Sequence, residues 1–258
     1  MRKSLRFLAV CLCFIACFAF VACSQKDDDK VTAQELYEQV KQYAVKDEII
    51  MNNQCNIYVN GNSFPLDVEP DYCISWCDKD NIYFTECVDN KYLLQSVDYN
   101  GKNKKLIQEV EHFLKPTYNN EVYSVIGKNY YFYEVGTLKL NESFVEPENW
   151  RDMQKRMYGY NMTNIGKDEG YTFEKDGKTI KIDTNDIHNI ENIKDIIADY
   201  ELKVHTPTCY GDTIYLGASI DFESEILFFA FKYENDKLTF VDACVTSPNL
   251  VDIVFIQK

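Results

Sequence analysis

The sequence has little of the chemistry on which most catalytic and metal sites depend. It contains three His residues, His112, His188 and His205, and His is the most common general base and a frequent zinc ligand. It has no His-Glu-x-x-His, Gly-x-Ser-x-Gly or Cys-x-x-Cys motif and no glycine loop of the phosphate-binding type. The sequence therefore predicts no catalytic residues, no metal and no cofactor.

Positive charge, glycine and proline are also scarce. The 258 residues include 27 Lys and Arg against 41 Asp and Glu, a net charge of −14, and such an acidic surface disfavours nucleic acid as a partner. Only 10 Gly and 6 Pro stand against 19 Tyr and 16 Phe, which favours β structure over disorder. The length suits one domain with a sizeable core.

One uncharged apolar run, residues 7–22, follows the basic residues Arg2, Lys3 and Arg6. The run is shorter than the roughly 20 residues that a helix needs to cross a bilayer. A basic start, a short apolar run and a small residue before an abrupt polar break are typical of a secretory signal peptide. We therefore expect residues 1–22 to be removed, which would take the net charge from −14 to −17.

The end of that run, Phe20-Val-Ala-Cys23 followed by Ser24, resembles the lipobox of bacterial lipoproteins, with Phe20 where Leu is usual. The resemblance implies a diacylglyceryl group on the Cys23 sulfur and cleavage that leaves Cys23 as the first residue. Lipid on Cys23 would anchor the exported protein to the membrane of the cell envelope. The acidic residues 23–30 would then form a solvated tether, because like charges without apolar residues do not fold.

Six Cys residues follow Cys23, an even number that invites disulfides in an exported chain. Cys73 and Cys77 lie too far apart along an extended strand to pair with each other. A hairpin after residue 77 would allow Cys73 to lie opposite Cys87. The sequence leaves two alternatives, a Cys73–Cys87 bridge and buried free thiols, and favours the thiols.

The remaining chain, residues 31–258, reads as one mainly β domain after a short helix. Residues 31–45 have helical spacing, with Leu36, Val40 and Tyr43 on one stripe and Thr32 as the cap. A pattern of turn, apolar strand, loop and apolar strand then recurs. Its main copies start at Ile82, Tyr130, Tyr171 and Ile214, which are 48, 41 and 43 residues apart.

Repeats of about 40 residues with several strands each are typical of propeller blades, which stack because one small sheet cannot bury its face alone. The stretch Asp98-Tyr-Asn-Gly101 with Leu106 resembles the Asp-x-x-Gly…Leu turn of TolB-like propeller repeats. We therefore predict a small propeller-like array of antiparallel blades. The alternative is an irregular β-sandwich or meander.

Two segments of helical spacing interrupt this pattern. Residues 146–160 place Trp150, Met153 and Met157 on one side, and residues 186–200 place Ile190, Ile193 and Ile197 on one side. We expect them to be helical excursions from the blades. Runs of aromatics, 130–133 and 228–233, must show side chains on both faces of their strands. One set should fill the core, and the other should pack between blades or offer a stacking surface.

A few residues have spacings that catalytic or metal sites also use. His205 and Cys209 lie four apart, but Pro207 argues against a shared helix face. The segment 78–81 reads as a hairpin turn and not as a calcium loop. Three alternating carboxylates that could line a hydrolase site are Asp221, Glu223 and Glu225.

Three functions remain open from the sequence. The first is a non-catalytic binding or scaffold lipoprotein whose partner is an envelope protein or a glycan. The main alternative is a carboxylate-based hydrolase of envelope polysaccharide or peptide. The third is a lipoprotein that occupies or shields another surface protein. Few His residues and no nucleophile motif favour the binding protein.

Overall fold

The computed structural model describes residues 31–46, 49–53, 56–66, 72–145, 150–166, 170–247 and 252–255, with the side chains of all but 162–166, 252 and 255. The chain divides into two compact units, Met1–Thr32 and Ala33–Lys258, and every described helix and strand belongs to the second. The predicted signal peptide, the lipidation site Cys23 and the tether 23–30 lie outside the described residues.

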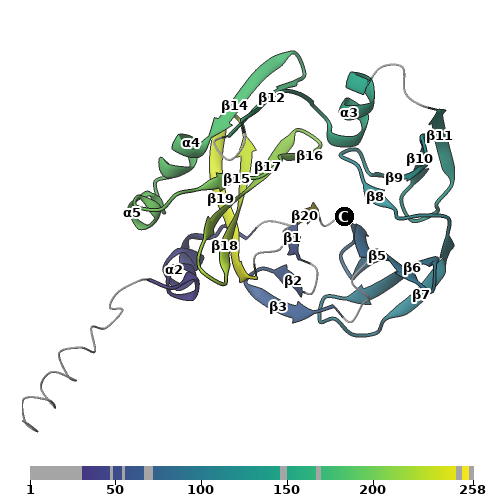
Figure 1. Ribbon diagram of the computed structural model, residues 1–258, viewed down its shortest axis with the longest axis horizontal. Coiled ribbons are helices and arrows are strands. Elements are labelled where there is room, and N and C mark those ends of the chain that lie inside the picture. The colour runs from purple at the N-terminus through teal and green to yellow at the C-terminus, as the bar shows by residue number, and fades with distance from the viewer. Residues whose placement is uncertain are drawn as a thin grey trace, which may run out of the picture. The chain divides into compact units, whose positions relative to one another are not determined.

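The described residues form five antiparallel sheets that follow one another around a propeller-like ring (Figure 1). The first sheet holds β1 (Ile49–Asn52), β2 (Asn56–Val59), β3 (Asn62–Pro65) and β20 (Asp252–Phe255). The second holds β4 (Tyr72–Cys77), β5 (Asn81–Val88), β6 (Lys91–Asp98) and β7 (Lys105–Val110). The third holds β8 (Lys115–Pro116), β9 (Glu121–Ile126), β10 (Asn129–Glu134) and β11 (Leu140–Val145).

The last two sheets complete the ring. The fourth holds β12 (Asn161–Gly166), β13 (Gly170–Lys175) and β14 (Lys178–Asp183). The fifth holds β15 (Lys203–Val204), β16 (Thr208–Tyr210), β17 (Thr213–Asp221), β18 (Ile226–Glu234) and β19 (Lys237–Thr246). The predicted mainly β, propeller-like fold is confirmed, and the alternative of a sandwich or meander is wrong.

The ring closes between segments from opposite ends of the second unit. β20 pairs with β1 in antiparallel register, with Ile50 opposite Val254. β20 also contacts β4 and β17, and β4 contacts β8, so strands of neighbouring sheets meet at these contacts. Closure by one terminal strand keeps β1 from being left as an unpaired edge.

The predicted repeat is correct in three of its four starting points. Ile82, Tyr171 and Ile214 lie on β5, β13 and β17, each the second strand of its sheet. Tyr130 instead lies on β10, the third strand of its sheet. The prediction is wrong there because the aromatic run resembles the start of a blade. The second strand of that sheet is β9, which begins at Glu121.

The Asp98–Gly101 turn has the conformation that its sequence requires. Oδ1 of Asp98 accepts hydrogen bonds from the backbone N–H groups of Asn100 (2.9 Å) and Lys102 (2.8 Å). Gly101 has a φ of +71°, which a residue with a Cβ rarely adopts. Leu106 is 62% exposed on the outer strand β7.

The helices differ from their predicted extents. α2 (Ala33–Val40) continues as the short 3-10 helix η1 (Lys41–Tyr43); Leu36 and Val40 are buried, but Tyr43 is exposed and lies off the predicted stripe. α3 (Trp150–Tyr158) buries Met153 and Met157 and leaves Trp150 half exposed. The predicted helix 186–200 is split into two short helices, α4 (Thr184–His188) and α5 (Lys194–Ile197), although Ile190, Ile193 and Ile197 are buried as expected.

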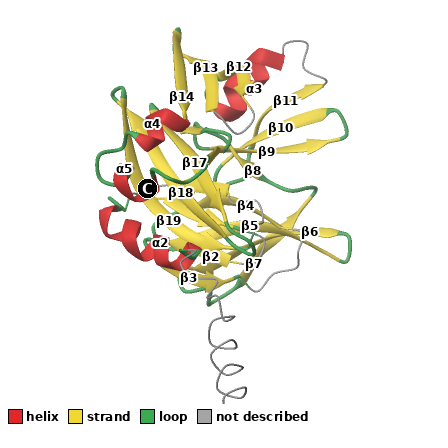
Figure 2. Cartoon of the chain, turned by 60° about the vertical axis from the view of Figure 1, so that its left-hand side comes forward, coloured by secondary structure: helices red, strands yellow, loops and turns green. Residues whose placement is uncertain are grey.

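Separate apolar layers fill the spaces between neighbouring sheets, as blade packing requires. On β18, Phe229 and Phe231 face the largest layer, which α2, α4 and α5 cover, while Phe228 faces the layer against β1 (Figure 2). Strand alternation therefore buries both faces of this strand. The pairing of each of the outer strands β7, β11 and β19 with its neighbour contains a register shift, the mark of a β-bulge. Bulges at an edge discourage further strands from adding there.

Candidate functional site

A groove runs between the second sheet (β4–β7) and the third (β8–β11). It consists of two cavities of about 410 and 400 Å³, which share Gln108 of β7 and Leu138 of the turn between β10 and β11. The first cavity is lined by Trp76, Asp78, Tyr83, Leu94, Ile107, Gln108, Asn120, Val135, Gly136 and Leu138. The second is lined by Gln108, Glu109, Val110, Glu111, His112, Leu114, Ser124, Tyr131, Tyr133, Leu138 and Leu140.

The hairpin between β4 and β5 fixes the aromatic part of the first cavity. Trp76 and Tyr83 are register partners on the two strands, and their rings stack with centroids 4.6 Å apart and planes 14° from parallel. The Tyr83 hydroxyl donates to Oδ2 of Asp78 at 3.0 Å. Burial raises the pKa of the Tyr83 phenol, and the neighbouring Asp78 carboxylate raises it further, so Tyr83 acts as a donor here.

Asp78 is held by the hairpin turn that the sequence predicts at 78–81. Its Oδ1 accepts hydrogen bonds from the backbone N–H groups of Asp80 and Asn81, both at 2.8 Å. An aspartate that hydrogen-bonds the backbone two residues on stabilises a turn. One carboxylate oxygen thus holds the turn while the other holds the Tyr83 ring in the groove.

The opposite wall comes from the aromatic run on β10. Tyr133 packs in the layer with Trp76, Leu94 and Leu114, while Phe132 packs in the layer against α3. Tyr131, one position from Phe132, lines the second cavity and is partly exposed. As predicted for this strand, some of its aromatic side chains pack in apolar layers, here Phe132 and Tyr133, and another, Tyr131, offers partly exposed surface.

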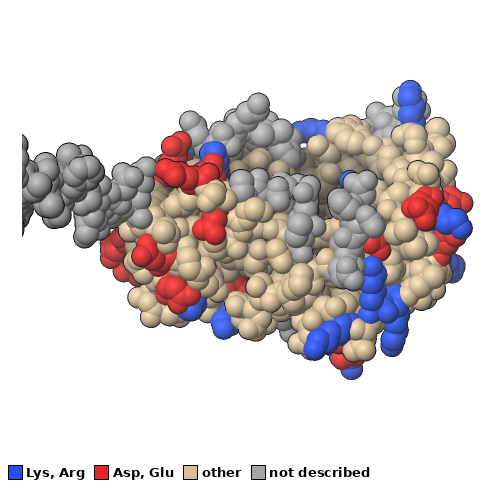
Figure 3. All heavy atoms as spheres, turned by 60° about the horizontal axis from the view of Figure 1, so that its bottom comes forward, with Lys and Arg blue, Asp and Glu red and all other residues tan. Residues whose placement is uncertain are grey.

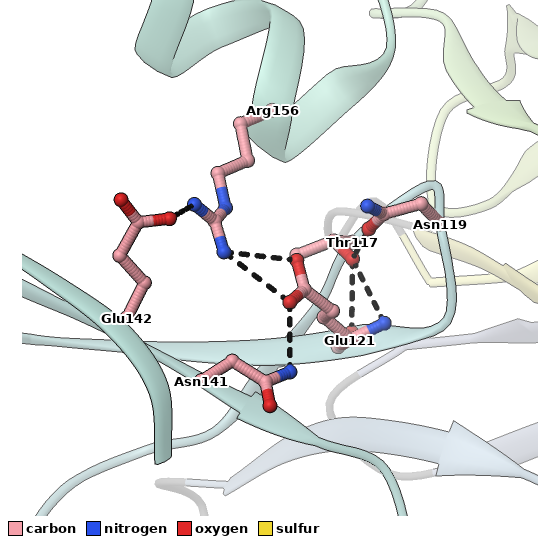
Figure 4. Close-up of polar contacts among 6 residues, drawn as sticks. All are labelled: Thr117, Asn119, Glu121, Asn141, Glu142 and Arg156. Atoms are coloured by element: carbon pink, nitrogen blue, oxygen red, sulfur yellow. Dashed lines mark hydrogen bonds and ion pairs between the residues drawn. The ribbon is translucent and has the colours of Figure 1, made fainter.

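An ion-pair cluster supports this wall from its other face (Figure 4). Arg156 of α3 places its guanidinium 4.1 Å from the ring centroid of Phe132, pairs with Glu142 and lies 3.2 Å from Oε1 of Glu121. Asn141 donates to the same Glu121 oxygen at 2.9 Å. Planar guanidinium groups suit such combined stacking and pairing. α3 and the third sheet are thereby joined into one support behind the groove.

The groove has an acidic lining. Among the described residues that line the two cavities, the carboxylates are Asp78, Glu109 and Glu111, the imidazole is His112, and there is no Lys or Arg. Glu109 is an exposed residue that pairs with Lys91 at 3.5 Å, an interaction weak enough for solvent or a ligand to replace. These acids favour a neutral or cationic ligand over an anionic one.

The exposed charges on one face of the unit are partly separated by sign. In Figure 3, Asp and Glu gather toward the left of the face shown, and Lys and Arg gather at its lower right. Three exposed lysines lie close together in the sequence: Lys102 and Lys104 in the turn between β6 and β7, and Lys105 at the start of β7.

Cys73 and Cys87, the possible disulfide, are not joined to each other in the structure. The hairpin places Cys73 opposite Thr85, and Cys87 pairs with Tyr92 on the next strand. The expected alignment of Cys73 opposite Cys87 is therefore displaced by two residues. The bulge between Ile74 and Trp76 shifts the register of this hairpin.

His205 and Cys209 do not form a site. The His205 Nε2 lies 2.9 Å from Oγ of Ser219, whereas Cys209 is fully buried in the largest apolar layer. Burial raises the pKa of the Cys209 thiol to about 12, the opposite of what a nucleophilic thiol needs.

The three carboxylates of the hydrolase hypothesis lie at one exposed turn. Asp221 ends β17 and pairs with Lys203, and Glu223 and Glu225 are exposed in the turn before β18. This turn is outside both cavities of the groove. A solvated surface is therefore the arrangement observed.

The segment 186–200 borders a separate pocket of about 520 Å³ with the β18–β19 hairpin. Tyr233 in its lining donates to Oδ1 of Asp236 at 3.1 Å. Lysines and acids both line this pocket, among them Lys181, Asp186, Glu191 and Lys237. The groove is the stronger candidate for a binding site, because it combines partly exposed aromatic rings with carboxylates that no lysine among its described lining residues offsets.

No motif or spacing in the sequence singles out Trp76, Gln108 or Leu138. The turn 135–138 carries one signal, because apolar Val135 and Leu138 are unusual in a hairpin turn. Leu138 also has a φ of +52°, rare for a branched side chain. Such a turn indicates that its apolar side chains have a surface to contact.

In the part of the chain that is described, no cluster of three or more His, Cys, Asp or Glu side chains has the arrangement of a metal site. No described helix has both the length and the apolar character needed to span a bilayer. Searches against protein-family models and curated proteins found no match for this chain.

Proposed function

We propose that this chain is an exported, lipid-anchored binding module that holds a ligand of the cell envelope in the groove between the second and third sheets. The observation that carries the proposal is the groove itself, with partly exposed Tyr131, Tyr133 and Tyr83 on two rigid walls. Recognition sites commonly combine aromatic surface with a few fixed polar groups on a rigid scaffold.

The anchor rests on the sequence around Cys23. A single acyl chain gives only marginal membrane binding, whereas several chains on one residue give stable attachment. The hydrolase alternative has no comparable support, since Asp221, Glu223 and Glu225 lie at an exposed turn away from the groove.

Replacing Cys23 with Ala should move the protein from the membrane fraction to the soluble fraction and remove the lipid from its intact mass. The wild-type chain should require detergent for extraction and should begin at Cys23. Fractionation followed by intact mass spectrometry of both forms measures this. Equal partitioning of the two forms, with no added mass on the wild type, would contradict the anchor.

Replacing Tyr131 with Ala should abolish capture of the native ligand while leaving the unfolding midpoint nearly unchanged, because Tyr131 is partly exposed. The measurement is crosslinking of membrane-extracted protein followed by affinity purification and identification of proteins and sugars. Tyr43→Ala is the matched control, since Tyr43 is exposed on η1 and outside the groove. Equal capture by both variants would place the binding site elsewhere.

A further inference from the structure

We infer that the ligand of this groove is an oligosaccharide that carries amino groups, a conclusion that rests on the binding function proposed above. The groove offers aromatic rings in both of its cavities, amide side chains and, among the described residues of its lining, negative charge without Lys or Arg. Each of these features matches one part of an amino-sugar polymer.

The aromatic rings match the apolar faces of sugar rings. A pyranose has a face of C–H bonds that packs on an aromatic ring, while its hydroxyls remain at the rim. Tyr83 lines one cavity and Tyr131 the other, and both rings are partly exposed. The stack with Trp76 holds the Tyr83 ring in place, so little side-chain entropy is lost on binding.

The amides match the hydroxyls. Gln108 and Asn120 are exposed and line the cavities, and an amide side chain both donates and accepts hydrogen bonds. Because Gln108 belongs to both cavities, it lies where two neighbouring sugar units would meet. Two neighbouring cavities that share Gln108 and Leu138 therefore favour an oligomer over a single sugar.

The carboxylates of the lining favour a sugar that carries positive charge. Asp78 belongs to the first cavity, and Glu109 and Glu111 belong to the second. An ammonium group gains from these acids and from the faces of the tyrosines, whereas a uronic acid is repelled. An extended basic peptide would satisfy the charges, but it lacks the repeated flat apolar faces that match the rings.

The test is calorimetric titration of the full-length protein with three probes: a glucosamine oligomer, the same oligomer fully N-acetylated, and an oligogalacturonate. All are measured in one slightly acidic buffer, so that the amines carry charge. The glucosamine oligomer should bind about fivefold or more tightly than its acetylated form, and added salt should reduce that difference. The oligogalacturonate should not bind.

Asp78→Asn combined with Glu111→Gln should erase the preference for the charged oligomer, because both changes keep the side-chain shape. The amide introduced at position 78 would still accept the turn hydrogen bonds through its carbonyl oxygen. The control pair Asp221→Asn and Glu225→Gln removes the same charge at a turn outside the groove, and should leave the preference intact.

Equal affinity for the charged and acetylated oligomers, or binding of the oligogalacturonate, would overturn the inference. An equal reduction of the preference for the charged oligomer in the groove pair and in the control pair would also overturn it. If no sugar binds while Tyr131→Ala still abolishes capture of the native ligand, the inference fails and the proposed binding function stands. If Tyr131→Ala has no effect on capture, the proposed function fails as well.

Discussion

A chain ended after Ser247 should lose most of its stability, by about 4–5 kcal/mol or more. This deletion removes β20, and with it the antiparallel partner of β1 from Ile49 to Asn52. It also takes Val254 out of the apolar layer between the first and second sheets, in which Ile50 and Phe84 are fully buried. The ring would open, and β1 would become an unpaired edge.

Chemical denaturation followed by fluorescence measures this loss. A synthetic peptide of residues 249–258 added to the shortened chain should restore part of the lost stability in proportion to its concentration, because binding to the folded state shifts the equilibrium. A peptide with Val254 replaced by Asp is the control and should not restore it. A shortened chain as stable as the full one would show that β20 does not close the ring.

The order of strands in this fold could be predicted because it is local. Each sheet is built mostly from consecutive strands, and the turns between them carry their own signals, as Asp98 and Gly101 do at the β6–β7 turn. Alternation of apolar residues then identifies the strands, and the spacing of 40-odd residues identifies the blades.

The pairing of β20 with β1 has no such signal, since about 200 residues separate the two strands. The spacing of apolar residues in the 186–200 segment also could not predict its division into α4 and α5. Ile190, Ile193 and Ile197 need only be buried together, and a 3.6-residue period does not distinguish one helix from two short helices with a turn.

The groove could not be predicted from the sequence for a related reason. Its residues come from the β4–β5 hairpin, from β7 and from the β10–β11 turn, which are adjacent only once the second and third sheets pack together. Sequence spacing brings Trp76 near Tyr83 but not near Leu138. The aromatic run on β10 indicated that some side chains would be available, without indicating what they face.

Replacing Gly170 with Ala should destabilise the protein by about 3 kcal/mol or more, because two independent costs add. Gly170 has a φ of +148°, which L residues rarely adopt. A Cβ there would meet the carbonyl oxygen of Ile182 and would lie 2.6 Å from Cα of Asp183, both backbone atoms that cannot rotate away. Thermal unfolding monitored by circular dichroism measures the change.

Gly177→Ala is the matched control, since Gly177 lies in the same sheet and also has a positive φ, +78°, but nothing lies within 4 Å of its added Cβ. It should cost about 1 kcal/mol, the strain of the backbone alone. The difference between the variants therefore isolates the close approach of β13 and β14. Equal losses would show that β14 moves away without cost.

That close approach has a consequence beyond the sheet. Asp183, opposite Gly170, caps α4: its Oδ1 accepts from the backbone N–H of Asn185 at 3.0 Å, and its own N–H donates to Asp186 at 2.8 Å. A methyl group at position 170 displaces this cap, and loss of a cap costs about 1 kcal/mol by itself. Gly170→Ala should therefore also loosen α4 and the layer around Ile187, which hydrogen exchange at the α4 amides would detect and which Gly177→Ala should not change.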